Sequence, residues 1–217
     1  MKTKGINWRY AIGEIIIVTI GILIAFGINT FSLNLSIEKR YEEYKASLIT
    51  DLNENLKSID KIIAAQELKV VELNTVIDHI ELGTLKRDSI SSILYRQRKS
   101  PTFFPISGTF KSLVSQGEIE IFSTDLKREL FNLYDTQYER TVYNGALYDK
   151  IYVDIYDSDI RKALDLKTKQ VEDIQMLQSK DFIKDLMLIV DEAESYLELV
   201  KRSKLESEKL LTLIRED

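Results

Sequence analysis

Acidic side chains and one histidine are the residues whose types and spacing could support chemistry in this chain. The run Asp51-Leu-Asn53-Glu-Asn55 begins like a calcium-binding loop, which needs a glycine at its sixth position and a glutamate at its twelfth. Leu56 and Ile62 occupy those two positions. The run therefore predicts a segment of helix and no calcium site.

The remaining candidates for a metal or catalytic centre are equally incomplete. Asp154, Asp157 and Asp159 form an acidic cluster without the glycine and glutamate of a calcium loop, and His79 is the only histidine. Cysteine is absent, which excludes disulfides, thiolate nucleophiles and cysteine-ligated metals. The sequence also contains no phosphate-binding glycine loop and no nucleophile elbow. We expect no catalytic residue, cofactor or metal, and hence a protein that is not an enzyme.

Glu14 has the most informative position of the acidic residues, because it lies inside a long apolar segment. Trp8 to Phe31 reads WRYAIGEIIIVTIGILIAFGINTF, with aromatic residues at both ends, as at membrane interfaces. As a helix, residues 10–31 span about 33 Å, which matches a hydrocarbon core of about 30 Å. We expect a transmembrane helix over residues 10–31, lying in a lipid bilayer and not cleaved as a signal peptide.

The charges that flank this segment predict its orientation. Lys2, Lys4 and Arg9 precede it without any acid before Glu14, whereas the residues from Glu38 onward carry mixed charges. Positively charged flanks stay in the cytoplasm. We therefore expect a cytoplasmic N-terminus at residues 1–9 and an extracytoplasmic domain at residues 32–217.

Glu14, Gly21, Ala25 and Ile28 share one face of the predicted membrane helix. The step from Gly21 to Ala25 places two small residues four apart, which allows another helix to approach closely. One hypothesis is that this face contacts a second membrane helix, with Glu14 paired to a group on it. The other is that Glu14 lies near the cytoplasmic boundary and extends into water.

The apolar segment also carries a resemblance to a known family. The run Tyr10-Ala-Ile-Gly-Glu-Ile-Ile-Ile-Val-Thr-Ile-Gly-Ile-Leu-Ile-Ala25, followed by Ile28-Asn29, resembles the start of an uncharacterised bacterial family. The likeness extends more loosely through Ser115-Gln-Gly117 to the C-terminal helix. The resemblance implies one N-terminal membrane helix, a helical ectodomain and a bacterial inner membrane with the ectodomain in the periplasm. It implies no chemistry.

Residues 32–217 are predicted to be all-α, forming an antiparallel bundle with coiled-coil-like seams. The first helix has no proline or glycine until Gly83, and a kink is most expected at Ser32, Asn34 or Ser36. Residues 83–122 should be irregular, with short helices near Ser89–Gln97 and Gly108–Ser115 and extended backbone before each proline. The expected seam of the first helix alternates in steps of three and four: Ile49, Leu52, Leu56, Ile59, Ile63, Gln66, Val70, Leu73, Ile77 and Ile80.

Two further long helices are predicted after the irregular part. One is capped by Ser123 or Thr124 and runs to about Leu164, with Val142, Leu147 and Ile151 among its apolar positions. The other is capped by Ser179 and runs to the C-terminus, where Ser203 and Ser207 interrupt the apolar stripe and predict fraying or a partner. The stripe of this last helix contains Phe182, Leu186, Ile189, Ala193, Tyr196, Val200, Leu210 and Ile214.

A row of tyrosines on the predicted helix that runs from Ser123 or Thr124 to about Leu164 is the second candidate interaction site. One hypothesis is an aromatic surface for a glycan or peptide, and the other is a stripe that packs against a neighbouring helix while its hydroxyls reach water. The row contains Tyr134, Tyr138, Tyr148, Tyr152 and Tyr156.

Three functional hypotheses remain open, and the net charge of −5 argues against nucleic acid as a partner. The leading one is a membrane-anchored scaffold or adaptor that binds another protein or a second copy of itself through its helices. The second is a small subunit of a proton-driven membrane complex that uses Glu14. The third is a ligand-sensing ectodomain that acts through a partner in the membrane.

Overall fold

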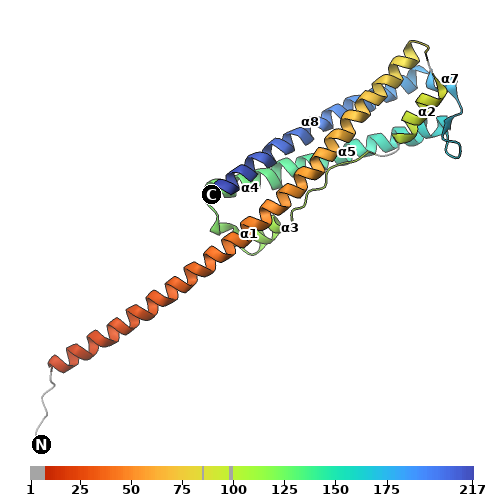
Figure 1. Ribbon diagram of the computed structural model, residues 1–217. Helices are drawn as coiled ribbons and strands as arrows, with labels where there is room; N and C mark the ends of the chain where they lie inside the picture. Colours follow the sequence, from red (N-terminus) through yellow and green to blue (C-terminus); the bar gives the residue numbers. More distant parts are fainter. Residues whose placement is uncertain (1–7, 85, 98–99) are drawn as a thin grey trace, which may run out of the picture. The chain divides into compact units, whose positions relative to one another are not determined.

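The structure is a computed structural model that describes residues 8–84, 86–97 and 100–217. It separates into two compact units, of which the second is Ser47–Asp217 (Figure 1). Helix α1 (Trp8–Glu81) belongs to both units and runs without interruption through Ser32, Asn34 and Ser36, where a kink was most expected. Lys2 and Lys4, on which the predicted orientation depends, lie outside the described residues.

The first unit contains the apolar part of α1. Its large apolar side chains from Ile12 to Ile37 are 43–72% exposed. Thr19, the polar residue within this run, donates its hydroxyl to the Ile15 carbonyl at 2.8 Å, so the helix itself satisfies it. Within the described chain this is the one helix that is long and apolar enough to cross a membrane, with a mean hydropathy of 2.2 over an 18-residue window.

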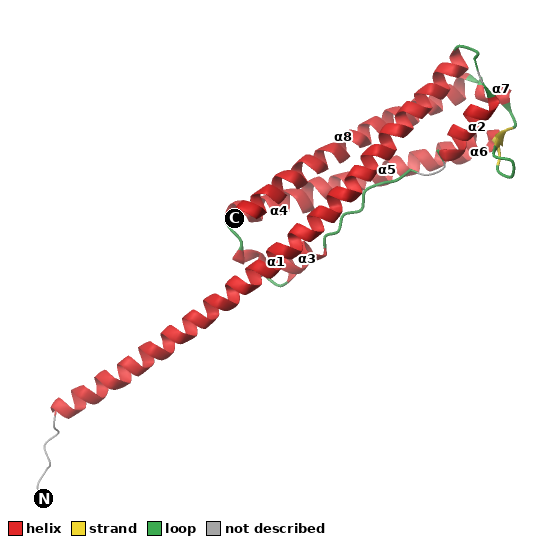
Figure 2. Cartoon of the chain, in the orientation of Figure 1, coloured by secondary structure: helices red, strands yellow, loops and turns green. Residues whose placement is uncertain are grey.

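The second unit confirms the all-α prediction (Figure 2). The remainder of α1 packs with a second rod, in which π-helical turns join α-helical parts end to end, and with the long helix α8. Short elements connect these three. The bounds are α2 Arg87–Arg96, α3 Gly108–Ser115, η1 Glu118–Ile121, α4 Thr124–Phe131, η2 Asn132–Tyr138, α5 Glu139–Ile155, η3 Tyr156–Ile160, α6 Arg161–Ala163, β1 Leu164–Asp165, β2 Gln170–Val171, α7 Ile174–Leu177 and α8 Lys180–Glu216.

The helix ends follow from local chemistry that the sequence displays. Gly83, with a φ of +65°, terminates α1 in a left-handed conformation that suits glycine. Ser123 and Ser179 cap α4 and α8, each accepting a hydrogen bond from the backbone N–H three residues later. These three positions confirm the predicted boundaries.

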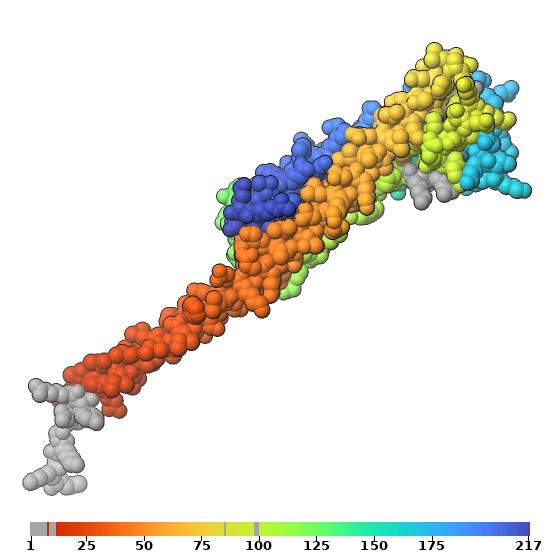
Figure 3. All heavy atoms as spheres, viewed as in Figure 1, coloured from red at the N-terminus to blue at the C-terminus, as the bar shows by residue number. Residues whose placement is uncertain are grey.

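Helix α8 runs antiparallel to both of the other rods. Lys201 pairs with Glu67 at 3.0 Å and Lys204 with Asp60 at 2.8 Å, so higher numbers on α8 meet lower numbers on α1 (Figure 3). By contrast, α1 and α5 run parallel, because the chain returns along the bundle between them. The return is made by α2, the extended residues 100–107, and α3.

The buried stripe of α1 lies one residue away from the predicted seam at four of its ten positions. Leu52, Ile59, Gln66, Leu73, Ile77 and Ile80 are buried as expected, but Ile49, Leu56, Ile63 and Val70 are only half-buried. Their preceding neighbours face the core instead: Leu48, Asn55, Ile62 and Lys69. The prediction selected the more apolar of two adjacent stripes. The fold instead buries the stripe that contains the amide of Asn55 and the amine of Lys69.

The second rod departs from prediction for a related reason. Its π-helical turn at Asn132–Tyr138 widens the helix by one residue, which rotates the residues that follow. Thr141, Gly145, Tyr148 and Tyr152 therefore face the core, while the expected Val142 and Ile151 are half-buried and Leu147 is exposed.

The predicted fraying of the C-terminal helix is wrong, because Ser203 and Ser207 are fully buried and bonded. Ser203 Oγ lies 2.8 Å from Thr141 Oγ1, and Ser207 Oγ lies 2.6 Å from the hydroxyl of Tyr138. Hydroxyls on the rotated part of the second rod thus supply the partner that these serines need. All eight apolar positions predicted for α8 are buried.

Candidate functional site

An extended segment, residues 100–107, lies against the helices of the second unit, and buried polar side chains hold its backbone. Asn55 binds Ile106 twice, donating to its carbonyl at 2.9 Å and accepting from its N–H at 2.7 Å. Gln66 donates to the Pro101 carbonyl at 2.8 Å. The Phe103 N–H donates to the hydroxyl of Tyr196 at 2.8 Å, and the Phe103 ring is fully buried.

These bonds explain the polar residues in the core stripe of α1. A helix uses its own backbone groups internally and offers none to a neighbouring extended chain. Side chains must therefore bond the carbonyls and N–H groups of the segment, since an unpaired buried group costs about 1–3 kcal/mol. Asn55 and Gln66, which are both almost fully buried, perform this role.

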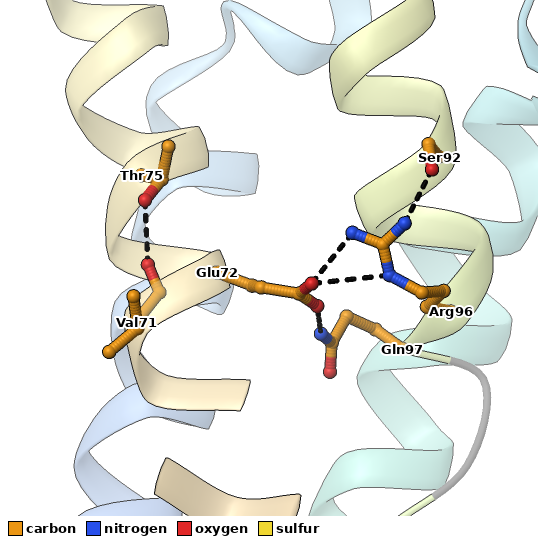
Figure 4. Close-up of polar contacts among 6 residues, drawn as sticks. All are labelled: Val71, Glu72, Thr75, Ser92, Arg96 and Gln97. Carbon is orange, nitrogen blue, oxygen red and sulfur yellow. Dashed lines mark hydrogen bonds and ion pairs between the residues drawn. The ribbon is translucent and has the colours of Figure 1, made fainter. Parts of the chain in front are cut away.

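A second polar cluster ties the end of α2 to α1 (Figure 4). Glu72 accepts hydrogen bonds from Nε and Nη2 of Arg96 at 3.1 and 2.6 Å and from Nε2 of Gln97 at 2.6 Å. Ser92 Oγ accepts from Arg96 Nη1, which orients the guanidinium. This cluster fixes the chain just before the extended segment begins.

The tyrosine row lies in the core, which corrects the hypothesis of an exposed aromatic surface. Tyr134, Tyr138, Tyr148 and Tyr152 are at most 4% exposed, and only Tyr156 is partly exposed. The alternative, packing against a neighbouring helix, describes them better. Their hydroxyls do not reach water, however, since Tyr138 bonds Ser207 and Tyr148 donates to Gln66 at 3.1 Å.

The rings pack edge to face and in stacks with aromatic residues from the other elements. The Phe103 and Tyr138 centroids lie 5.0 Å apart at an interplanar angle of 69°, and Tyr148 stacks on Tyr196 at 5.4 Å. Burial raises the pKa of Tyr138 and of Tyr148 to about 12, so both hydroxyls stay protonated at neutral pH.

Gly145 is the position at which this packing leaves no space for a side chain. A Cβ added there would lie 3.0 Å from the hydroxyl oxygen and 3.1 Å from a ring carbon of Tyr196. Tyr196 has little freedom to move, because it stacks on Tyr148 and accepts the Phe103 N–H.

Lys69 is a core residue that the sequence reasoning missed. It is 3% exposed, and its Nζ lies 3.8 Å from the ring centroid of Tyr152 and 5.6 Å from that of Tyr148. Burial lowers its pKa to about 7, and the carboxylate of Asp149 partly opposes that shift. Its place in the seven-residue series of Leu48, Asn55 and Ile62 is the sequence feature that could have revealed it.

The predicted membrane-helix face is exposed along its length. Glu14, Gly21, Ala25 and Ile28 are all exposed on the first unit, and no atom lies within 4 Å of where a Cβ on Gly21 would stand. The packing of the described chain therefore gives no reason for glycine there. The role of Glu14 stays a prediction.

The described residues include no group of three or more His, Asp or Glu side chains placed to hold a metal ion. Their hollows are open grooves. One of about 450 Å³ lies between the extended segment and the second rod, with Phe104, Phe110 and Tyr143 in its lining. The Phe104 and Tyr143 side chains are 74% and 66% exposed.

Comparison with known protein families identifies one of unknown function. A sequence family described as a family of unknown function (DUF6090) matches residues 14–195. No curated protein and no solved structure matches the chain. The matched range includes the membrane-helix face, the core stripe of α1 and the tyrosine row.

Replacing Asn55 with alanine should lower the free energy of unfolding by about 1–3 kcal/mol, because both backbone groups of Ile106 lose their partner. Urea unfolding of the full chain in detergent, followed by circular dichroism, measures this change. Asn53→Ala is the matched control: Asn53 donates only to the Ile49 carbonyl of its own helix, and its loss should cost under about 0.5 kcal/mol. Equal losses for both variants would contradict the assigned role of Asn55.

Gly145→Ala should destabilise the protein, although alanine in a helix is intrinsically better than glycine by about 1 kcal/mol. The Cβ must displace Tyr196, and we expect a net loss of about 1–3 kcal/mol in the same unfolding experiment. A double-mutant cycle with Tyr196→Phe supplies the control, since removing the nearest atom should reduce the penalty. A more stable Gly145→Ala variant would show that Tyr196 is free to move.

Proposed function

The chain belongs to the family of unknown function DUF6090, and we propose that this protein is a membrane-anchored, non-enzymatic helical module that acts through protein contacts. The observation that carries this proposal is the apolar first part of α1, whose side chains are exposed in the chain by itself. The same helix continues into the second unit, so anchor and bundle share one continuous element.

The anchor role is proposed for the exposed apolar surface of the first part of α1. A monomeric protein in water rarely exposes an apolar patch larger than a few hundred Å². This helix exposes fifteen large apolar side chains between Ile12 and Ile37, around its whole circumference. A bilayer covers such a surface on all sides, whereas a single partner helix covers one face. The flanking Lys2, Lys4 and Arg9 favour a cytoplasmic N-terminus and a periplasmic bundle in a bacterial inner membrane.

The contact role of the anchor is proposed for the face that contains Gly21 and Ala25. Within a bilayer, helices associate through small residues that let their backbones approach closely. Gly21 is exposed and its missing side chain relieves no clash within this chain. Close approach of a second copy of the anchor gives that glycine a purpose, with Ala25 and Ile28 on the same face.

The anchor predicts a specific response to charge. Ile20→Arg together with Leu23→Arg should release the protein from membranes, since each arginine costs about 2.5–3.5 kcal/mol at the centre of a membrane helix. Alkaline carbonate extraction of membranes, followed by sedimentation, measures the retained fraction. Leu68→Arg with Val71→Arg is the matched control, because these residues are equally exposed but lie in the second unit. Extraction of the wild type by carbonate would contradict the anchor.

The contact face predicts crosslinking between copies. The chain has no cysteine, so Val18→Cys introduces a single thiol beside Gly21 on this face. Oxidation of the full-length protein in membranes should yield a disulfide-linked dimer, and Gly21→Leu should strongly reduce its yield. Gly27→Leu, at an equally open glycine on another face, should leave the yield unchanged. Absence of dimer in the parent Val18→Cys protein would exclude self-association through this face.

A further inference from the structure

Lys69 is a buried ionisable residue that forms no hydrogen bond to the extended segment among the described residues. Its Nζ is buried and has no hydrogen-bond partner among the described residues. The hydroxyl of Tyr152 is likewise buried without a hydrogen-bond partner in the described chain. Asn55 and Gln66, on the same stripe of α1, are by contrast bonded to backbone groups of the segment.

Among the residues that the structure describes, no carboxylate forms an ion pair with Lys69. Asp149 acts on it only as a charge, without a hydrogen bond between them. Glu72, one helical turn further along α1, is occupied by Arg96 and Gln97. The titratable and charged groups nearest to Lys69 on α5 are Tyr148, Asp149 and Tyr152. On the other elements packed here they are Glu72 of α1, Arg96 of α2, which pairs with Glu72, and Tyr196 of α8, which stacks on Tyr148.

The balance of energies in this pocket disfavours an ammonium ion. Removing an ion from water without an ionic or hydrogen-bonding partner is costly. The cation–π contact with the ring of Tyr152 offsets only part of that cost. A neutral amine has neither the desolvation cost of the ion nor its cation–π attraction. Burial therefore lowers the pKa of Lys69 to about 7.

The position of Lys69 links its charge to the extended segment. Gln66 lies one turn before it on α1, donates to the Pro101 carbonyl and accepts from the hydroxyl of Tyr148. Tyr148 in turn lies beneath Lys69 and stacks on Tyr196, which accepts the Phe103 N–H. A movement of the Lys69 side chain away from these rings therefore disturbs the packing behind two contacts that hold the segment, the Gln66 bond to Pro101 and the Tyr196 bond to Phe103.

We infer that Lys69 is a proton-operated switch in the bundle. With a neutral amine, α1 closes on the tyrosines of α5 and the extended segment is held. With an ammonium, the side chain must leave the aromatic pocket for water, and this loosens the contact between α1 and α5 and frees the backbone of residues 100–107.

The direction of the pH dependence follows from the two pKa values. In the unfolded chain Lys69 has the ordinary lysine pKa of 10.5, and in the folded chain the value is about 7. Between these two pH values the unfolded state binds the extra proton, so stability rises with pH. Below pH 7 both states are protonated, and stability stays at its lower level.

Hydrogen exchange and urea unfolding of the full chain in detergent, measured from pH 6 to pH 9, test the switch. Corrected for intrinsic exchange, the opening constant of residues 100–107 should fall by up to about tenfold for each pH unit above 7. Lys69→Met should abolish this dependence and protect the segment at pH 6 as well as the wild type does at pH 9. Lys61→Met, at an exposed lysine of the same helix, should behave as the wild type.

A His79→Gln background removes the single histidine, so that it cannot supply the signal. A flat pH profile in the wild type, or an unchanged slope in Lys69→Met, would overturn the switch. If Lys69→Met does not fold, nuclear magnetic resonance of the wild type with 13Cε-labelled lysine decides the matter. A lysine resonance with its inflection near pH 7 supports the switch, and titration of every lysine above about pH 9 overturns it.

Discussion

The extended segment at residues 100–107 imposes the main constraint on the second unit. Its backbone needs hydrogen-bond partners, and the neighbouring helices use their own backbone groups internally. Asn55, Gln66 and Tyr196 supply them from two different helices. Their positions set which stripe of α1 faces inward and how close α8 lies. The parallel arrangement of α1 and α5 has the same origin, since the segment carries the chain back along the bundle between them.

Elements governed by local chemistry could be predicted from the sequence, and those governed by distant partners could not. The stop at Gly83, the caps at Ser123 and Ser179 and the bounds of α3 depend on neighbouring residues and were predicted correctly. The buried stripe of α1 depends on Ile106, 51 residues beyond Asn55, and apolar periodicity carries no trace of that partner. Similarly, Ser203 and Ser207 read as interruptions because Tyr138 and Thr141, on a π-distorted helix, are their partners.

The candidate sites divide in the same way. The membrane-helix face is a property of one helix, so sequence spacing suffices to define it, and the family match beginning at residue 14 includes it. The tyrosine row was placed on a helix correctly, but its exposure depends on what packs over it. A stripe of tyrosines suits a surface or a core equally well. Gly145 indicates the core, because glycine in the middle of a helix is otherwise unfavourable and here it makes room for the Tyr196 ring of a packed neighbour.

Lys69 differs in kind from the other polar residues of its stripe. Leu48, Asn55, Ile62, Lys69 and Val76 recur every seven residues on α1, so each occupies the same inward position. Leucine, isoleucine and valine there contribute packing, and asparagine contributes two hydrogen bonds to the segment. Methionine could fill the same space with a similar unbranched side chain, and the Lys69 amine has no hydrogen-bond partner among the described residues. What lysine adds at this position is a proton that binds and leaves near neutral pH, and the geometry around it transmits that change to the segment that Gln66 and Tyr148 hold.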